Sequence, residues 1–318
     1  MNLSMTGALA AAYRSGAQRA RVVTEAWGEK NLFCPNCSSP KLTWLEPGHP
    51  ASDYSCPACG FWYQLKSQRA PIRSSINDGA YRAMMDAIHN DALPSMYFMQ
   101  YDLATWRVRN LLLVPHFAFP PSAIIKRKPL AATARRAGWV GCNFDLRRIP
   151  AEARIDVVRT MARQRSAAVS AAGFSTVPVR DATRGETPRR PAGVDACATV
   201  IVPPEEVRDK FKRVIPLKEI SIQQRGWTLD VLNTVRRLVE SRRRGKESLI
   251  EKPREDQSLL TSAPTGEFTT ADAYTFTREL EKLHPDNRHV KDKIRQQLQV
   301  LRDAGLLIHV GRGVWRLP

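Results

Sequence analysis

The chain has 318 residues, and 43% of them are hydrophobic, which is ordinary for a soluble globular protein and sufficient for two domains with separate cores. No stretch is apolar for long enough to cross a membrane, so we expect no membrane partner. The sequence does not indicate any protein partner. The 49 Lys and Arg residues exceed the 31 Asp and Glu residues and give a net charge of +18, which indicates a polyanionic partner. The sequence has no basic amphipathic helix with aromatic anchors of the kind that binds a membrane surface, so nucleic acid is the favoured partner.

The N-terminal residues predict an amphipathic helix over about residues 6–27. Basic residues follow the alanines of this segment, which is the reverse of the order in a secretory signal. We therefore expect a cytoplasmic protein, in which closely paired cysteines bind a metal ion rather than form disulfides.

Four of the six cysteines form two Cys-x-x-Cys pairs with the spacing of a four-thiolate zinc site, namely Cys34, Cys37, Cys56 and Cys59. The other two, Cys142 and Cys197, stand alone. Four thiolates fill a tetrahedral shell, so we predict one structural zinc ion per chain that holds a hairpin together and takes no part in the chemistry. An accidental pairing of the four cysteines is the alternative.

A strand is predicted over residues 61–66, directly after the second cysteine pair. Side chains alternate along a strand, so Gln64 and Lys66 lie next to each other on one face. Asp53 precedes the same cysteine pair on the opposing strand. A zinc ion bound between the two pairs would keep these strands in register.

The combination of Asp53, Gln64 and Lys66 resembles the Asp…(Glu/Asp)-x-Lys core of the restriction-endonuclease-like PD-(D/E)xK superfamily. This resemblance implies an α/β catalytic domain in which Asp53 and Gln64 bind Mg²⁺ together with the Leu65 carbonyl, while Lys66 activates the attacking water. Such a centre suits phosphodiester hydrolysis, because a hard cation polarises a phosphoryl oxygen and acidifies a bound water. The pattern is short, and a solvated surface hairpin is the alternative.

Three further elements are predicted before the middle of the chain. The segment 74–88 predicts a helix that opens at Asn77 or Asp78. Two short apolar runs at 96–102 and 108–115, separated by a polar turn, predict the two strands of a hairpin.

Residues 126–141 combine basic and small residues with a tryptophan and predict a DNA-binding segment. The basic side chains would bind phosphates, and Trp139 could pack against an apolar base substituent. An ordinary core position is the alternative for Trp139. The basic residues assigned to this segment are Lys126, Arg127, Lys128, Arg135 and Arg136.

A change of composition to Arg, Ser, Ala, Pro and Thr at about 163–197 predicts a mobile insertion. Order is expected to return in 200–214, where Pro-Pro-Glu-Glu is typical of a helix start. A second soft stretch is predicted at 242–257.

The last hundred residues predict a winged-helix domain. Helices are expected over 227–240, 268–283 and 288–305, followed by two short strands around residues 311–313. The polar face of the third helix and the tip of the wing would read DNA through Arg and Gln contacts, although a solvated charged face is the alternative. These residues are His289, Lys291, Lys293, Arg295, Gln296 and Arg312.

Longer stretches of the chain resemble the DpnI-type methyl-directed (type IIM) restriction endonucleases. They include ARVVTEAW, CPNC, CPAC, QLKS, SSINDGAY, IIKRKPLAATARRAGWVGCNFDL, RGWTLDVLN and IRQQLQVLRDAG. The resemblance implies a hydrolase that cuts duplex DNA at GATC containing N6-methyladenine, with Trp139 at the methyl groups and sequence read by both domains. Gln64 departs from the glutamate of the family pattern, which predicts weaker Mg²⁺ binding.

The predicted architecture is thus an α/β nuclease domain over 1–217 with an inserted zinc hairpin, and a winged-helix domain over 222–318 with an insertion at about 242–262. The expected activity is that of a type II site-specific deoxyribonuclease. Two alternatives remain open at this point: a methyl-DNA binding protein that Gln64 leaves catalytically weak or dead, and a zinc-containing winged-helix regulator.

Overall fold

The computed structural model describes residues 1–46, 52–161, 198–250 and 266–318, with residues 244–250 described by their backbone alone. The predicted insertion at 163–197 and most of the one at 242–262 lie outside the described residues, as does Cys197.

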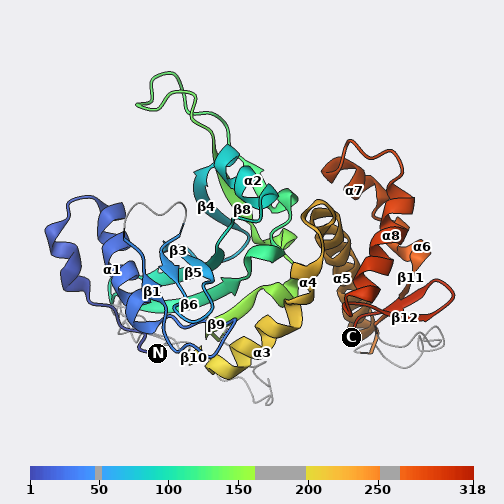
Figure 1. Cartoon of the computed structure of the whole chain (residues 1–318), viewed down its shortest axis with the longest axis horizontal. Helices are drawn as coiled ribbons and strands as arrows, with labels where there is room; N and C mark the ends of the chain where they lie inside the picture. Colours follow the sequence, from blue (N-terminus) through green and yellow to red (C-terminus); the bar gives the residue numbers. More distant parts are fainter. Residues whose placement is uncertain (47–51, 162–197, 251–265) are drawn as a thin grey trace, which may run out of the picture.

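A seven-stranded sheet forms the centre of the N-terminal part (Figure 1). Among its paired strands, only β3 and β5 run parallel to each other. The two strands predicted at 96–102 and 108–115 are confirmed as the antiparallel pair β5 and β6. Residues 96–99 of β5 are fully buried, because helices or loops cover both faces of this central strand. The strand order is β1 (Thr43–Trp44), β2 (Tyr54–Ser55), β3 (Trp62–Gln68), β5 (Ser95–Asp102), β6 (Arg107–Val114), β9 (Ile155–Thr160) and β10 (Thr199–Ile201).

The helices around this sheet differ in part from the prediction. The helix expected over 6–27 is divided into η1 (Gly7–Ala12) and α1 (Gly16–Asn31), because Ser15 adopts an extended conformation before α1. The helix expected from Pro-Pro-Glu-Glu is confirmed as α3 (Pro204–Val214), followed by α4 (Pro216–Glu219). Short 3₁₀ turns connect other elements: η2 (His116–Ala118), η3 (Pro121–Ala123), η4 (Leu146–Arg148) and η5 (Ala151–Ala153).

A second, three-stranded sheet has the order β4 (Ser75–Ala80), β8 (Gly141–Asp145) and β7 (Ile124–Lys126). The prediction of a helix over 74–88 was wrong for its first half, since only α2 (Tyr81–His89) is helical. Ile76 is buried opposite Phe144, and this long-range pairing overrides the local tendency of Asn77 and Asp78 to cap a helix. The segment between β7 and β8 projects from the molecule (Figure 1).

The C-terminal part begins with the long helix α5 (Ile222–Ile250). The predicted soft stretch therefore does not begin at residue 242, since the helix continues to Ile250. No helix among the described residues combines the length and apolarity that a bilayer span requires.

A small helical domain with its own sheet follows α5. The helix expected over 268–283 is divided into β11 (Glu267–Thr269), α6 (Thr270–Tyr274) and α7 (Thr277–Leu283), and Thr269 begins α6 in a capping box with Asp272. The expected third helix is confirmed as α8 (Val290–Asp303), and Gly305 leaves it with a φ of +71°, a backbone conformation that favours glycine. The strands β12 (Ile308–Gly311) and β13 (Val314–Arg316) complete the sheet in the order β11, β13, β12.

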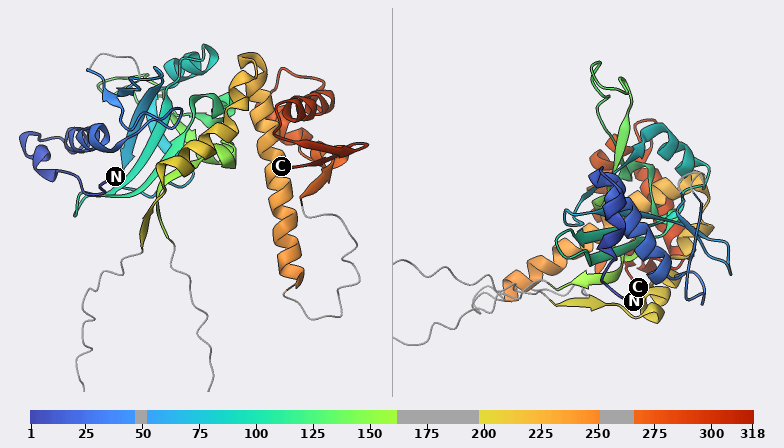
Figure 2. Two further views of the ribbon diagram at one scale, coloured as in Figure 1. Left: turned by 60° about the horizontal axis from the view of Figure 1, so that its bottom comes forward. Right: turned by 90° about the vertical axis from the view of Figure 1, so that its left-hand side faces the viewer.

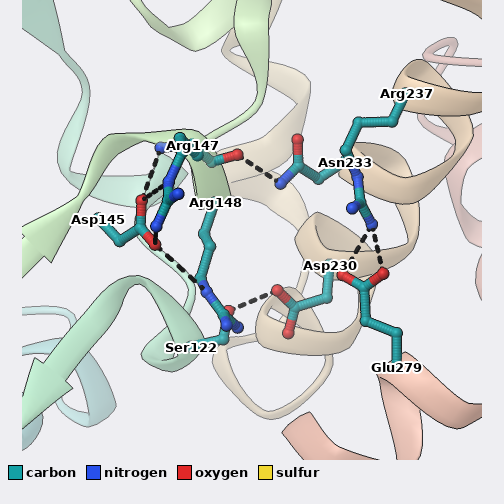
Figure 3. Close-up of polar contacts among 8 residues, drawn as sticks. All are labelled: Ser122, Asp145, Arg147, Arg148, Asp230, Asn233, Arg237 and Glu279. Atoms are coloured by element: carbon teal, nitrogen blue, oxygen red, sulfur yellow. Dashed lines mark hydrogen bonds and ion pairs between the residues drawn. The ribbon is translucent and has the colours of Figure 1, made fainter. Parts of the chain in front are cut away.

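Helix α5 lies between the N-terminal part and the C-terminal helices (Figure 2). Asp230 on α5 accepts hydrogen bonds on both sides, at 2.5 Å from the Ser122 hydroxyl and at 2.9 Å from His284 Nε2. Next to it, Asn233 donates to the Arg147 carbonyl and Arg237 pairs with Glu279 of α7 (Figure 3). The two parts of the molecule are therefore joined through polar contacts that centre on one helix.

We expect Asp230→Ala to destabilise the protein by about 2–3 kcal/mol, because the Ser122 hydroxyl and the His284 ring both lose a buried acceptor. Ser122→Ala removes only one of these bonds and should cost about 1 kcal/mol. Urea unfolding of both variants measures the difference, and equal losses would contradict the bridging role of Asp230.

Candidate active site and DNA-binding surfaces

The four paired cysteines come together at one end of the β2–β3 hairpin. Their Sγ atoms all lie within 4.8 Å of one another, with 3.6 Å between Cys34 and Cys59 and 3.5 Å between Cys37 and Cys56. A tetrahedral zinc ion with bonds of about 2.3 Å separates its sulfur ligands by about 3.8 Å. The cluster can therefore hold zinc with little movement, and it leaves no open position for a substrate.

Backbone donors favour the thiolate form in one of these knuckles. Burial acts to raise the pKa of Cys56, but the backbone amides of Cys59 and Ala58 donate to its sulfur and bring the pKa down to about 6. A thiolate is the form that ligates zinc.

Arg208 of α3 supports the other knuckle and was not predicted from the sequence. Its Nε atom donates to the carbonyls of Cys34 (3.1 Å) and Cys37 (2.8 Å), and its Nη2 atom donates to the carbonyl of Ser39 (3.2 Å). The guanidinium group also lies 5.2 Å from the centre of the Phe33 ring. Because these contacts join residues about 170 positions apart, no local sequence signal could have indicated them.

The hairpin places Asp53 beside the strand that carries the predicted glutamine and lysine. Tyr54 pairs with Tyr63, and the Asp53 amide donates to the Tyr63 carbonyl, so Asp53 lies across from Gln64. One carboxylate oxygen of Asp53 accepts a hydrogen bond of 2.8 Å from the Leu65 amide. The structure thus brings Asp53, Gln64 and Lys66 to one face of the hairpin, as the alternation of the strand predicted.

Opposing effects act on the Asp53 carboxyl group. Burial raises its pKa, while the hydrogen bond from Leu65 and the positive charges of Lys66 and Arg21 act against this rise. The net shift is upward, so the group binds a proton more readily than an exposed aspartate. A bound cation would displace that proton.

Sequence reasoning missed Glu25 on α1, which lies near this face. The Tyr54 hydroxyl donates to the Glu25 carbonyl at 2.8 Å, which holds α1 against the residue that follows Asp53. Burial raises the pKa of Glu25, the ion pair with Arg21 acts to lower it, and the charge of Asp53 contributes to the rise. Glu25 stands within the stretch ARVVTEAW, in which no site residue was predicted.

Asp78 on β4 was also missed as a site residue, because it was assigned to a helix start. It forms an ion pair with the Lys66 ammonium group, and its side chain is only 2% exposed. The second sheet therefore reaches the candidate active site through this contact.

The predicted DNA-binding segment around residues 126–141 is exposed. All five basic side chains assigned to it are exposed, whereas Trp139 is half-buried, with Arg136 5.0 Å from the centre of its ring. A Cβ atom at Gly141 would come within 2.7 Å of the Trp139 ring, so the ring packs tightly on the backbone at the start of β8. Trp139 is thus not a core residue, and its ring is held in place at the base of the projecting segment.

Helix α8 presents the polar face that its sequence pattern predicted. Its apolar residues Val290, Ile294, Leu298 and Leu301 are buried, as expected. The side chains assigned to DNA binding are exposed, except that Lys293 is half-buried and donates to Gln296 at 2.9 Å. Arg312 is exposed in the turn between β12 and β13.

Comparison with known families gives two matches. The family model DpnI, described as the Dam-replacing family, matches residues 1–176, which is more than half of the chain. The model DpnI_C, described as the Dam-replacing HTH domain, matches residues 260–317. The first match contains the cysteine cluster and the hairpin residues Asp53, Gln64 and Lys66, and the second contains α8 and the terminal strands.

We expect one zinc ion per chain in the purified protein, measured by elemental analysis. Cys56→Ser should release the metal and destabilise the hairpin, because a structural zinc site contributes directly to folding. Cys142→Ser is the matched control, since Cys142 is a free buried thiol of β8 outside the cluster and its replacement should leave the zinc content at one. Absence of zinc from the wild-type protein would refute the assignment.

Proposed function

We propose, since the chain belongs to the Dam-replacing family of DpnI type, that it is a Mg²⁺-dependent restriction endonuclease that cuts duplex DNA at GATC sites containing N6-methyladenine. The observation that carries this proposal is the grouping of Asp53, Gln64 and Lys66 on one face of the clamped hairpin. This grouping supports a catalytic domain of the PD-(D/E)xK type.

The residues present fit a divalent metal ion. One Asp53 oxygen accepts from the Leu65 amide, which leaves the other for a cation, and the Gln64 side chain lies across the strand from it. Mg²⁺ would be held by Asp53, the Gln64 amide oxygen and the Leu65 carbonyl, and it would supply the charge that polarises the phosphoryl oxygen and acidifies the attacking water.

The protein itself would orient the reaction through Lys66. Its ammonium group can donate a hydrogen bond to the attacking water and stabilise the negative charge that grows on the phosphoryl oxygens. The amide of Leu65 meanwhile fixes the Asp53 carboxylate, so that this ligand needs no rearrangement. Both roles depend on the register of one hairpin.

Two domains would read the DNA. The exposed basic residues between β7 and β8 can bind phosphates next to the cleavage centre, with Trp139 packed against the adenine methyl groups. Helix α8 would enter the major groove with Arg295 and Gln296, and Arg312 would contact the backbone in the manner of a winged helix. We propose boundaries of 1–217 and 222–318 for these domains, so that the first ends within the short helix α4 and the second begins with α5.

A non-cleaving reader of methylated DNA is the second candidate, and Gln64 favours it. A neutral amide binds Mg²⁺ more weakly than a carboxylate does. Burial raises the pKa of both Asp53 and Glu25, and the charge of Asp53 adds to the rise at Glu25, so a second carboxylate lies near Asp53 on this face.

We expect Asp53→Ala and Lys66→Ala to abolish cleavage of methylated plasmid while DNA binding persists, because each removes a charge that only the reaction needs. Gln64→Glu should lower the Mg²⁺ concentration for half-maximal rate, since hard cations prefer carboxylate ligands. Digestion of methylated and unmethylated plasmid over a Mg²⁺ titration measures all three.

Unmethylated plasmid is the control and should stay intact. Cleavage by Asp53→Ala at the wild-type rate would falsify the assignment of the centre. If the wild type never cuts and Gln64→Glu does, the methyl-DNA reader becomes the better description, and methylation-independent binding without cleavage would favour a zinc-containing regulator.

For the second domain, we expect Arg295→Ala to weaken binding to methylated GATC duplex by about 1–3 kcal/mol. If Arg295 contacts a phosphate instead of a base, the loss is similar for all sequences and the salt slope falls by about one. Fluorescence anisotropy at several salt concentrations distinguishes these cases. Arg213→Ala on α3 is the control, since this exposed arginine lies outside both proposed surfaces, and an equal effect there would argue against α8.

A further inference from the structure

We infer that Asp78 is a positioning residue that holds the Lys66 ammonium group for catalysis from the second sheet. The inference rests on the proposed nuclease function and adds a residue to it. Asp78 would not touch the substrate or the metal ion, and it would act only through Lys66.

The local structure of β4 places this carboxylate. Asn77 of β4 pairs with Asn143 of β8, and Ala80 pairs with Gly141. Two residues of β4 but only one residue of β8 lie between these pairs, so β4 carries one extra residue. Such a β-bulge bends a strand and changes the direction of its side chains. The bulge falls at Asp78 and Gly79, and Asp78 contacts the hairpin through its ion pair with Lys66.

The burial of Asp78 makes the ion pair more than a surface contact. An exposed pair between flexible side chains contributes little, whereas the Asp78 side chain is only 2% exposed, so its carboxylate oxygens depend on partners within the protein. The lysine is less buried, with 27% of its side chain exposed, so it is partly open to solvent. The Asp78 carboxylate is thus held in place by burial, while Lys66 remains able to contact a substrate.

The charges around Lys66 explain why such a residue is needed. Asp53 acts on it from the hairpin and Asp78 from β4, while Cys142 of β8 lies close enough for its thiol to sense both Lys66 and Asp78. With a glutamine at position 64, Asp53 is the only anionic member of the proposed catalytic trio. Without Asp78, the ammonium group would be drawn to Asp53 and would compete with the metal ion for that carboxylate.

The test compares Asp78→Asn with wild type in single-turnover cleavage of methylated DNA. We expect the rate at saturating Mg²⁺ to fall roughly a hundredfold, as for a misplaced catalytic group, and the Mg²⁺ concentration for half-maximal rate to rise because Lys66 then competes for Asp53. DNA affinity should be unchanged, and Asp78→Glu should restore part of the rate. Asp86→Asn on the neighbouring helix α2 is the matched control, since it removes an exposed carboxylate and should cut like wild type.

A stability cycle provides a readout that needs no activity. Asp78→Asn alone leaves the lysine without its buried partner, so Asp78→Asn combined with Lys66→Met should melt at a higher temperature than Asp78→Asn. If the changes in melting temperature caused by the two substitutions simply add, Asp78 and Lys66 do not interact and the inference is wrong. If the wild-type protein cuts and Asp78→Asn cuts at the same rate with the same Mg²⁺ requirement, the inference is wrong and the proposed function stands. If the wild-type protein does not cut, both are wrong.

Discussion

The hydrogen bond from the Leu65 amide to the Asp53 carboxylate sets the geometry on which the candidate active site depends. It exists only in one register of the β2–β3 hairpin, and β2 has just two residues, too few to fix a register by backbone pairing alone. The cysteine cluster closes the end of this hairpin, and Arg208 attaches the first knuckle to α3. A cysteine cluster that can hold a zinc ion would thus take the place of longer paired strands in fixing this register.

The parts of this arrangement that the sequence could predict are those recorded in local periodicity or short spacings. The cysteine pairs, the alternation that puts Gln64 beside Lys66, and the buried stripe of α8 all belong to this kind. The parts it could not predict depend on contacts between distant segments. Asn77 and Asp78 look like helix caps until β4 pairs with β8, and nothing near Glu25 indicates that α1 packs beside the hairpin.

The ion pair between Asp78 and Lys66 connects two sheets that have different tasks in the proposed function. β3 carries the proposed metal ligands, whereas β4 pairs with β8, and β8 begins directly after the exposed basic segment and Trp139. The proposed catalytic lysine is therefore paired with a residue of the sheet that carries the proposed DNA-binding segment. Correct placement of Lys66 requires both sheets to be in position, which is a stricter requirement than the hairpin imposes by itself.

The same electrostatics give a physical reason for a glutamine at position 64. The carboxylates of Glu25, Asp53 and Asp78 already face the cations of Arg21 and Lys66, and burial raises the pKa of both Glu25 and Asp53. A fourth carboxylate would add like charge to a half-buried site and raise these pKa values further, which costs stability while no cation is bound. If Mg²⁺ binds here as proposed, glutamine avoids that cost and still offers an oxygen to the ion, although it would bind the ion more weakly than a carboxylate.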